Sequence, residues 1–362
     1  MHDRARPDIT HRAERLLAWF DRNRRDLPWR AGPGERADPY RVWLSEIMLQ
    51  QTTVAAVAPR WATFLERFAD VGVLAAAPWE EVAAAWAGLG YYARARNLHA
   101  AAKQLAANGF PADEAGWRAL PGVGAYTAAA IAAIALGQPA VAVDGNVERV
   151  MARLHAIGAP LPAAKRALGE AAAQLLAEAA ARARPGDAVQ ALFDLGATIC
   201  TPRRPACALC PLAEDCAARA AGSQESLPAK APRKARPALS GAVFWAEDSS
   251  GRVWLRRRPP HGLLGGMLEL PGTEWLTEMT LAEALGFAPV PAAWRVAGEV
   301  RHVFTHFSLR LSVLAARLPV LASPPGAGFL VARDQVIASG LPSVMAKAAR
   351  LALSGSTFVP RV

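Results

Sequence analysis

The chain shows two different patterns of hydrophobic and polar positions along its length. From Thr10 to about Ala221, apolar residues recur at three- and four-residue spacing between Pro and Gly breaks, as they do in amphipathic helices. One such helix includes residues 42–49, and another begins near Val147. The pattern therefore predicts an all-α domain over residues 1–221.

A different pattern begins after this region. Residues 222–238 are rich in Pro, Lys and Arg and offer little to bury, which is typical of an interdomain linker. Within residues 242–255, two apolar runs flank the turn signal Asp-Ser-Ser-Gly and predict a β-hairpin. We also expect one strand over Arg301–Leu314 and a closing helix over Ser343–Leu353. Residues 239–362 are thus predicted to form an α+β domain.

Composition and charge describe a folded, basic protein. Hydrophobic residues make up 52% of the 362 residues and charged residues 20%, which argues against a disordered or fibrous chain. The net charge of +10 favours an anionic partner such as nucleic acid. The longest uncharged stretch, Val123–Val143, is broken by two glycines and a proline and is read as a buried helix rather than a membrane span. Residues 1–4 lack the apolar core of a signal peptide, so we expect a cytoplasmic protein. We also expect a monomer.

The cysteines form a single cluster with the spacing C-x6-C-x2-C-x5-C. Disulfides are rare in a reducing compartment, whereas four closely spaced thiolates suit a zinc ion or a four-iron cluster. By the chemistry of the residues alone, zinc and iron-sulfur are equal alternatives. The four residues are Cys200, Cys207, Cys210 and Cys216.

A glycine pair precedes a long Ala-rich helix in the segment Leu120–Thr127. Gly122 and Gly124 permit positive φ angles and a close backbone approach, so exposed N–H groups and the helix N-terminus could together hold a phosphate oxygen. A plain turn between two helices is the alternative.

Two carboxylic acids occur in settings that suit opposite roles. Glu46 has apolar neighbours, which should raise its pKa and keep it protonated. Asp144 directly precedes a helix, where unpaired backbone amides favour the ionised form. Cleavage of a glycosidic bond needs such a pair, an acid for the leaving group and an anion for the cationic sugar. An exposed helix position for Glu46 and a simple N-cap for Asp144 are the alternatives.

Together these motifs resemble those of the MutY glycosylases of the helix-hairpin-helix superfamily. The cysteine spacing after an all-α domain is similar to the cluster loop of endonuclease III and MutY enzymes, and Leu120–Thr127 is similar to their hairpin. Glu46 in Ser-Glu-Ile-Met-Leu-Gln-Gln-Thr and Asp144 in Val-Asp-Gly-Asn-Val-x-Arg match MutY motifs. The resemblance implies a 4Fe-4S cluster on the four cysteines. It also implies an enzyme that removes adenine mispaired with 8-oxoguanine, or with guanine, from double-stranded DNA.

The resemblance also implies roles for individual residues. Glu46 would protonate adenine and activate water, and Asp144 would stabilise the cationic sugar, with Tyr126 and Asn146 in support. Lyase-active members carry a Schiff-base lysine where this chain has Tyr126, which favours hydrolysis over an endonuclease III-like lyase reaction. Trp29, Arg30, Leu49 and Gln190 match positions around the adenine pocket. Gln51 matches a residue that probes the duplex, Tyr91 a wedge beside the mispair, and Gly122 and Gly124 the phosphate-binding hairpin.

The C-terminal part resembles a Nudix-like fold, beginning at Leu263–Gly272. Nudix hydrolases bind magnesium through a glutamate-rich helix, but Leu281–Gly286 supplies one Glu, so we expect no pyrophosphohydrolase activity. MutY enzymes use such a domain to recognise 8-oxoguanine through a Phe-Ser-His motif. Phe304-Thr305-His306 stands there, and Thr305 keeps the hydroxyl while adding a methyl group. An iron-sulfur electron carrier, the alternative from another class, would need neither the carboxylic acids nor the hairpin.

Overall fold

The computed structural model divides the chain into two compact units. One contains Met1–Ala85 and Arg94–Pro232, and the other contains Trp86–Ala93 and Arg233–Val362. None of the described helices is both long and apolar enough to cross a membrane. The structure describes residues 11–231, 236–259, 262–304, 306–319, 324 and 328–354.

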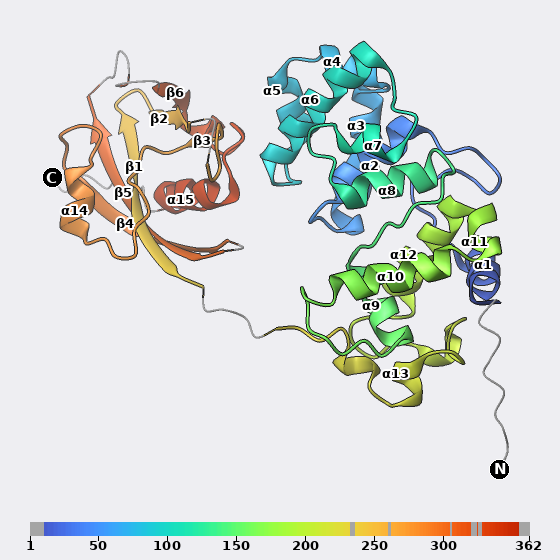
Figure 1. Ribbon diagram of the computed structural model, residues 1–362. Coiled ribbons are helices and arrows are strands. Elements are labelled where there is room, and N and C mark those ends of the chain that lie inside the picture. Colours follow the sequence, from blue (N-terminus) through green and yellow to red (C-terminus); the bar gives the residue numbers. More distant parts are fainter. Residues whose placement is uncertain are drawn as a thin grey trace. The chain divides into compact units, whose positions relative to one another are not determined.

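The first unit is built from helices, as predicted (Figure 1). Several begin at side-chain caps that the sequence supplies, such as Asp38, Thr53 and Asp70. The α-helices along this part of the chain are α1 (Arg12–Asn23), α2 (Pro39–Leu49), α3 (Val54–Arg67), α4 (Val71–Ala76), α5 (Trp79–Ala85), α6 (Tyr92–Asn108), α7 (Glu114–Arg118), α8 (Ala125–Ile134), α9 (Gly145–Leu154), α10 (Lys165–Leu176), α11 (Ala179–Ala183), α12 (Pro185–Thr198) and α13 (Ala217–Ala220).

Helix α8 is largely buried within this unit. Its residues from Thr127 to Ala133 are all buried, because the small Ala side chains let neighbouring helices approach closely. It contacts α2, α7 and α12. This packing brings the first turn of α8 close to α2, which carries Glu46. The uncharged stretch Val123–Val143 is therefore a buried helix only over Ala125–Ile134.

Residues 223–231 also belong to the first unit, although they were predicted to lie in the linker. Leu227 is buried in its core, and its carbonyl accepts a hydrogen bond from the guanidinium of Arg153. The Leu161 N–H donates to the carbonyl of Ala229 over 2.9 Å. One buried apolar side chain and a few backbone hydrogen bonds are enough to dock this segment, although its composition is that of a linker. The other proposed domain boundaries stay a prediction.

The second unit is a mixed sheet with helices. The described strands form one sheet in the order β3-β2-β1-β5-β4, in which β6 also pairs with β2 (Figure 1). β1 and β5 run parallel, and the other pairs are antiparallel. α15 packs against β4, β5 and β1. The elements are β1 (Ala238–Asp248), β2 (Arg252–Arg257), β3 (Leu268–Glu269), α14 (Leu281–Gly286), β4 (Arg295–Val303), β5 (Ser308–Leu318), β6 (Gly328–Ala332) and α15 (Ser343–Ser354).

This unit confirms the predicted hairpin, β1 to β2, and the closing helix, α15. The single strand predicted over Arg301–Leu314 is wrong. Two antiparallel strands, β4 and β5, occupy this region, and the backbone N–H of Phe304 donates to the carbonyl of Phe307 over 2.9 Å to close the turn between them. The turn contains neither Gly nor Pro, so no ordinary turn signal marked it.

Candidate active site and cluster loop

A cavity of about 790 Å³ in the first unit brings together all the predicted catalytic and adenine-pocket residues and one predicted DNA contact. Its walls come from α2, α8 and α12, from the start of α9, and from the loops that follow α1 and α2. The residues that the sequence predicted and that line this cavity are Trp29, Arg30, Glu46, Leu49, Gln51, Tyr126, Asp144, Asn146 and Gln190.

Glu46 is a buried carboxylic acid in the wall of this cavity. Its residue is 8% exposed, and burial raises its pKa to about 7. A hydrogen bond with Tyr126 works against this rise, the charge of Asp144 adds to it, and the charge of Arg30 opposes it. The predicted rise in the pKa of Glu46 is confirmed. Close to neutral pH, this side chain can both hold and release a proton.

Tyr126 stands on the first turn of α8, within hydrogen-bonding distance of Glu46. Burial raises the pKa of its phenol well above the ordinary value, and the negative charges of Glu46 and Asp144 raise it further. The phenol therefore stays protonated and donates its hydrogen bond to Glu46. Its ring lies 6.0 Å from the ring of Phe193 on α12.

Asp144 is the N-cap of α9 and at the same time lines the cavity. One carboxylate oxygen accepts the backbone N–H groups of Asn146 and Val147 over 2.9 and 2.8 Å. The other accepts the side-chain amide of Asn146 over 2.8 Å. These contacts hold the carboxylate in one orientation towards the cavity. The cap and the catalytic role, which were alternatives in the sequence, are compatible in the structure.

A hydrogen-bonded path joins Asp144 to the cysteine loop. The amide oxygen of Asn146 accepts a hydrogen bond from Arg149 over 2.7 Å. The same guanidinium donates to the carbonyls of Gly196 and Cys200, both over 2.6 Å. Asp144 and the cluster loop are therefore held in a fixed relation by one arginine.

The four cysteines line one small cavity between α9 and the loop that follows α12. Arg153, 2% exposed, donates to the sulfur of Cys200 over 3.3 Å. Burial raises the pKa of the Cys210 thiol to about 11, so a bound metal is needed to hold it as a thiolate at neutral pH. No three His, Cys, Asp or Glu side chains of the described residues are close enough to share one metal ion. The four cysteines fit an iron-sulfur cluster because they line the same cavity and because the buried guanidinium of Arg153 lies beside Cys200.

Two residues predicted to contact DNA have left-handed backbone conformations. φ is 52° at Gln51 and 49° at Tyr91, although neither residue is Gly. Such strain is found most often at functional sites. Tyr91 is 55% exposed and directly precedes α6, outside the residues that line the cavity. More than half of its surface is therefore open to solvent, as the wedge role predicted for it requires.

The glycine pair behaves differently at its two positions. Gly122 has a φ of 77°, and a Cβ there would lie 2.8 Å from the Cβ of Asn97. Gly124 has an ordinary φ of −85° and is the N-cap of α8, with open space around the position of its missing Cβ. Of the two glycines, Gly122 therefore uses the positive φ angle that glycine permits, and Gly124 does not. The second glycine leaves the helix N-terminus uncovered.

Sequence reasoning missed Gln50, which connects the hairpin to the Gln51 loop. Its side-chain amide donates to the carbonyl of Gly122 and to the hydroxyl of Thr127, both over 3.2 Å. It also lines the cavity. Gln50 lies inside the quoted Gln-Gln-Thr motif, so its place beside Gln51 was the one signal that could have found it.

In the second unit, the predicted recognition motif stands on the turn between β4 and β5. His306 is exposed, and Thr305 lies outside the described residues. The rings of Phe304 and Phe307 stack 4.7 Å apart, and Trp275 stacks 5.6 Å from Phe304. These aromatic rings anchor both ends of the turn. Sequence reasoning also missed the contribution of Trp275.

Models of three protein families match different parts of the chain. A model of the HhH-GPD superfamily of base excision DNA repair proteins matches residues 44–174, and one of the iron-sulfur binding domain of endonuclease III matches residues 200–216. A NUDIX domain model matches residues 242–351. The helical unit and its cavity thus define a helix-hairpin-helix base excision repair protein. The cofactor is a 4Fe-4S cluster, which settles the choice between zinc and iron-sulfur.

Comparison with individual relatives identifies the family within this class of base excision repair proteins. The solved structure of a thermostable thymine-DNA glycosylase is 30% identical, with a TM-score of 0.50 over 58% of this chain and 95% of its own. The adenine DNA glycosylase of Homo sapiens is 36% identical over 88% of this chain and 70% of its own length. That of Mycolicibacterium smegmatis is 43% identical over 57% of this chain and 69% of its own length. The chain belongs to the adenine DNA glycosylase family.

Proposed function

We propose that this chain hydrolyses the N-glycosidic bond of adenine mispaired with 8-oxoguanine, or with guanine, in double-stranded DNA. The observation that carries the proposal is one cavity that holds a buried acid with a pKa of about 7, Glu46, together with the carboxylate of Asp144. Tyr126 occupies the position of the lyase lysine, and a phenol cannot form an imine with the sugar. The product is therefore an abasic site in an intact strand.

The two carboxylic acids divide the work of the reaction. Protonated Glu46 donates its proton to a ring nitrogen of adenine, and the electron pair of the breaking bond leaves with the base. The carboxylate of Asp144 stabilises the cationic sugar that remains. Ionised Glu46 then accepts a proton from the attacking water, whose oxygen bonds to the sugar carbon, and the acid is regenerated. Tyr126 orients Glu46 throughout.

The remaining cavity residues suit a purine turned out of the duplex. Extrusion of a nucleotide costs a few kcal/mol, which contacts inside the pocket must offset. Trp29 and Leu49 offer apolar surface, and Arg30 and Gln190 offer hydrogen-bond donors. Tyr91, at the surface, and Gln51 would fill the gap left in the base stack.

The other proposed contacts lie outside this cavity. In the second unit, the side chains of Thr305 and His306 would hydrogen-bond 8-oxoguanine opposite the adenine. The hairpin at Gly122 and Gly124 would hold a backbone phosphate. When bound, the cluster would hold the cysteine loop rigid and add charge to it. Its ligands would be Cys200, Cys207, Cys210 and Cys216.

A strand-cleavage assay tests the proposal. The protein is incubated with end-labelled duplexes that carry adenine opposite 8-oxoguanine, adenine opposite guanine, or adenine opposite thymine, with and without alkali. Cleavage of the adenine strand only after alkali, and only in the mispaired duplexes, is the expected result. A duplex with thymine opposite guanine is included because of the thymine-DNA glycosylase relative. Cleavage without alkali, or release of thymine alone, would overturn the proposal.

The rate of adenine release should fall as the pH rises through about 7. Only protonated Glu46 can donate to the leaving base, and the fraction that is protonated decreases about tenfold for each pH unit above the pKa. Single-turnover rates on the 8-oxoguanine duplex, measured from acid to alkaline pH, check this.

The variant Tyr126→Phe tests whether the pH profile reports the titration of Glu46. It removes the hydrogen bond that lowers the pKa of Glu46, so the alkaline limb of the profile should move to higher pH. If the alkaline limb of this variant coincides with that of the wild-type protein, a group other than Glu46 is titrating.

A further inference from the structure

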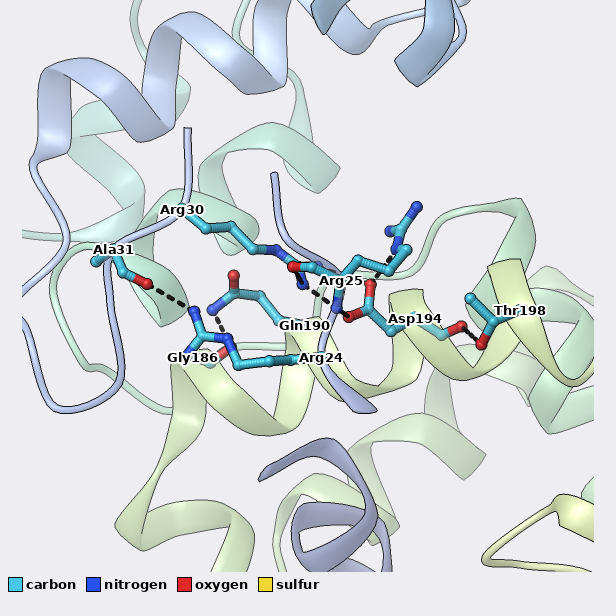
Figure 2. A network of polar contacts seen from close by, with 8 residues as sticks. All are labelled: Arg24, Arg25, Arg30, Ala31, Gly186, Gln190, Asp194 and Thr198. Atoms are coloured by element: carbon cyan, nitrogen blue, oxygen red, sulfur yellow. Dashed lines mark hydrogen bonds and ion pairs between the residues drawn. The ribbon is translucent and has the colours of Figure 1, made fainter. Parts of the chain in front are cut away.

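Helix α12 carries a completely buried carboxylate that the mechanism above does not use. Asp194 is 0% exposed, and both of its oxygens accept hydrogen bonds from Arg30, over 2.7 and 2.8 Å (Figure 2). Arg25 adds its backbone N–H over 3.0 Å and its guanidinium. Figure 2 shows both arginines reaching from the loop after α1 towards this one side chain.

These contacts keep Asp194 ionised. Burial by itself disfavours the charged form, but the hydrogen bonds and charges of Arg30 and Arg25 hold the pKa of Asp194 below its ordinary value. Hydrogen bonds to two parallel N–H groups fix the plane of a guanidinium as well as its position. Arg30 is therefore clamped in one orientation, with its side chain 7% exposed.

Arg30 is also a wall of the cavity, where its charge acts on Glu46. A cation beside Glu46 favours its ionised form, which cannot donate a proton to adenine. The charge of Asp194 opposes that of Arg30 at close range. Gln190, which also lines the cavity, lies one helical turn before Asp194. Helix α12 therefore positions two hydrogen-bond donors of the pocket, Gln190 directly and Arg30 through Asp194.

The titratable and charged groups that act on Glu46 come from several elements. Tyr126 comes from α8, Asp144 from the start of α9, and Arg30 from the loop after α1. Other charged residues that line the same cavity are Arg24, Arg25, Glu35 and Asp187.

We propose that Asp194 is a positioning residue of this site, which fixes the guanidinium of Arg30 in the pocket wall and neutralises its charge beside Glu46. The proposal rests on the proposed function for its effect on catalysis. Its effect on Glu46 is a property of the protein alone and can be measured without a substrate.

The variant Asp194→Asn removes the charge and keeps the size of the side chain and one acceptor oxygen. The uncompensated charge of Arg30 should then lower the pKa of Glu46 by about one unit. Because protonated Glu46 is the active form, the alkaline limb of the single-turnover profile should move to lower pH. At alkaline pH the rate should fall about tenfold, while binding of the mispaired duplex, measured by fluorescence anisotropy, stays at the wild-type level.

The double variant Arg30→Gln with Asp194→Asn separates charge from structure. Both charges are absent from it, so the limb should return towards its wild-type position even if the rate is lower at every pH. Asp21→Asn is the matched control, because Asp21 pairs with Arg184 at the surface, outside the cavity. Its profile should match that of the wild-type protein.

A rate that falls equally at all pH values in Asp194→Asn, with the limb unmoved, would show a merely structural role and overturn the proposal. Titration of the Glu46 carboxyl by ¹³C NMR in the wild-type protein and in both Asp194 variants gives the same comparison without any reaction. A downward shift there, in a protein that releases no adenine, would support the proposal for Asp194 and refute the proposed function.

Discussion

Replacing Glu46 by glutamine is expected to lower the single-turnover rate of adenine release about 1,000-fold, the usual contribution of a general acid. An amide cannot protonate the leaving base or accept a proton from water. Below neutral pH the buried acid is largely protonated and uncharged, so glutamine matches it in size and charge. The fold, the visible absorption of the cluster and the affinity for the mispaired duplex should therefore stay close to wild type. Rapid-quench kinetics, absorption spectra and anisotropy titrations measure the three quantities.

The control for this variant is Glu170→Gln, on an exposed face of α10, where Glu170 pairs with Arg166. It removes a charge of the same kind and should keep the wild-type rate. Retention of a tenth or more of the activity in Glu46→Gln would assign the proton transfer to another group. Unchanged DNA and cluster binding with no activity in any form of the protein would favour the electron-carrier alternative.

Local sequence was enough to single out Glu46, Asp144 and the four cysteines as candidates, while the family resemblance supplied their roles. Glu46 lies in an apolar helix and Asp144 directly before another helix, so burial and capping were visible from neighbouring residues. That the two side chains share one cavity depends on the packing of α2, α8 and α9. Composition and periodicity carry no information on this packing. Only the family resemblance indicated that these two side chains belong to one site.

Contacts between distant residues could not be predicted in this way. Asp194 meets Arg30 across 164 positions of sequence, and nothing near either residue marks the other as its partner. Asp194 lies between the apolar residues Phe193 and Leu195 on α12, and the sequence analysis did not single it out. Leu227 was missed for a related reason, because one buried side chain hardly changes the composition of a Pro-rich and Lys-rich segment.

Asp144→Asn should separate the two roles that Asp144 combines. Asparagine is as good an N-cap as aspartate, so the free energy of unfolding should change by less than about 1 kcal/mol. The negative charge is lost, however, and the cationic sugar loses its stabilising partner. We expect a fall of about 100- to 1,000-fold in the single-turnover rate, the size seen when one electrostatic stabiliser is removed. The charge of Asp144 also raises the pKa of Glu46, so the alkaline limb should move to lower pH.

Asp113→Asn is the control for the cap. Asp113 caps α7 and accepts the backbone N–H of Gly116 over 2.8 Å, but it does not line the cavity. Its replacement should leave both rate and stability near wild type. Asp144→Ala, which loses cap and charge together, should lose about 1 kcal/mol of stability in urea unfolding as well as the activity. If Asp144→Asn were fully active and only Asp144→Ala inactive, Asp144 would be a cap, and the cation would need another anion.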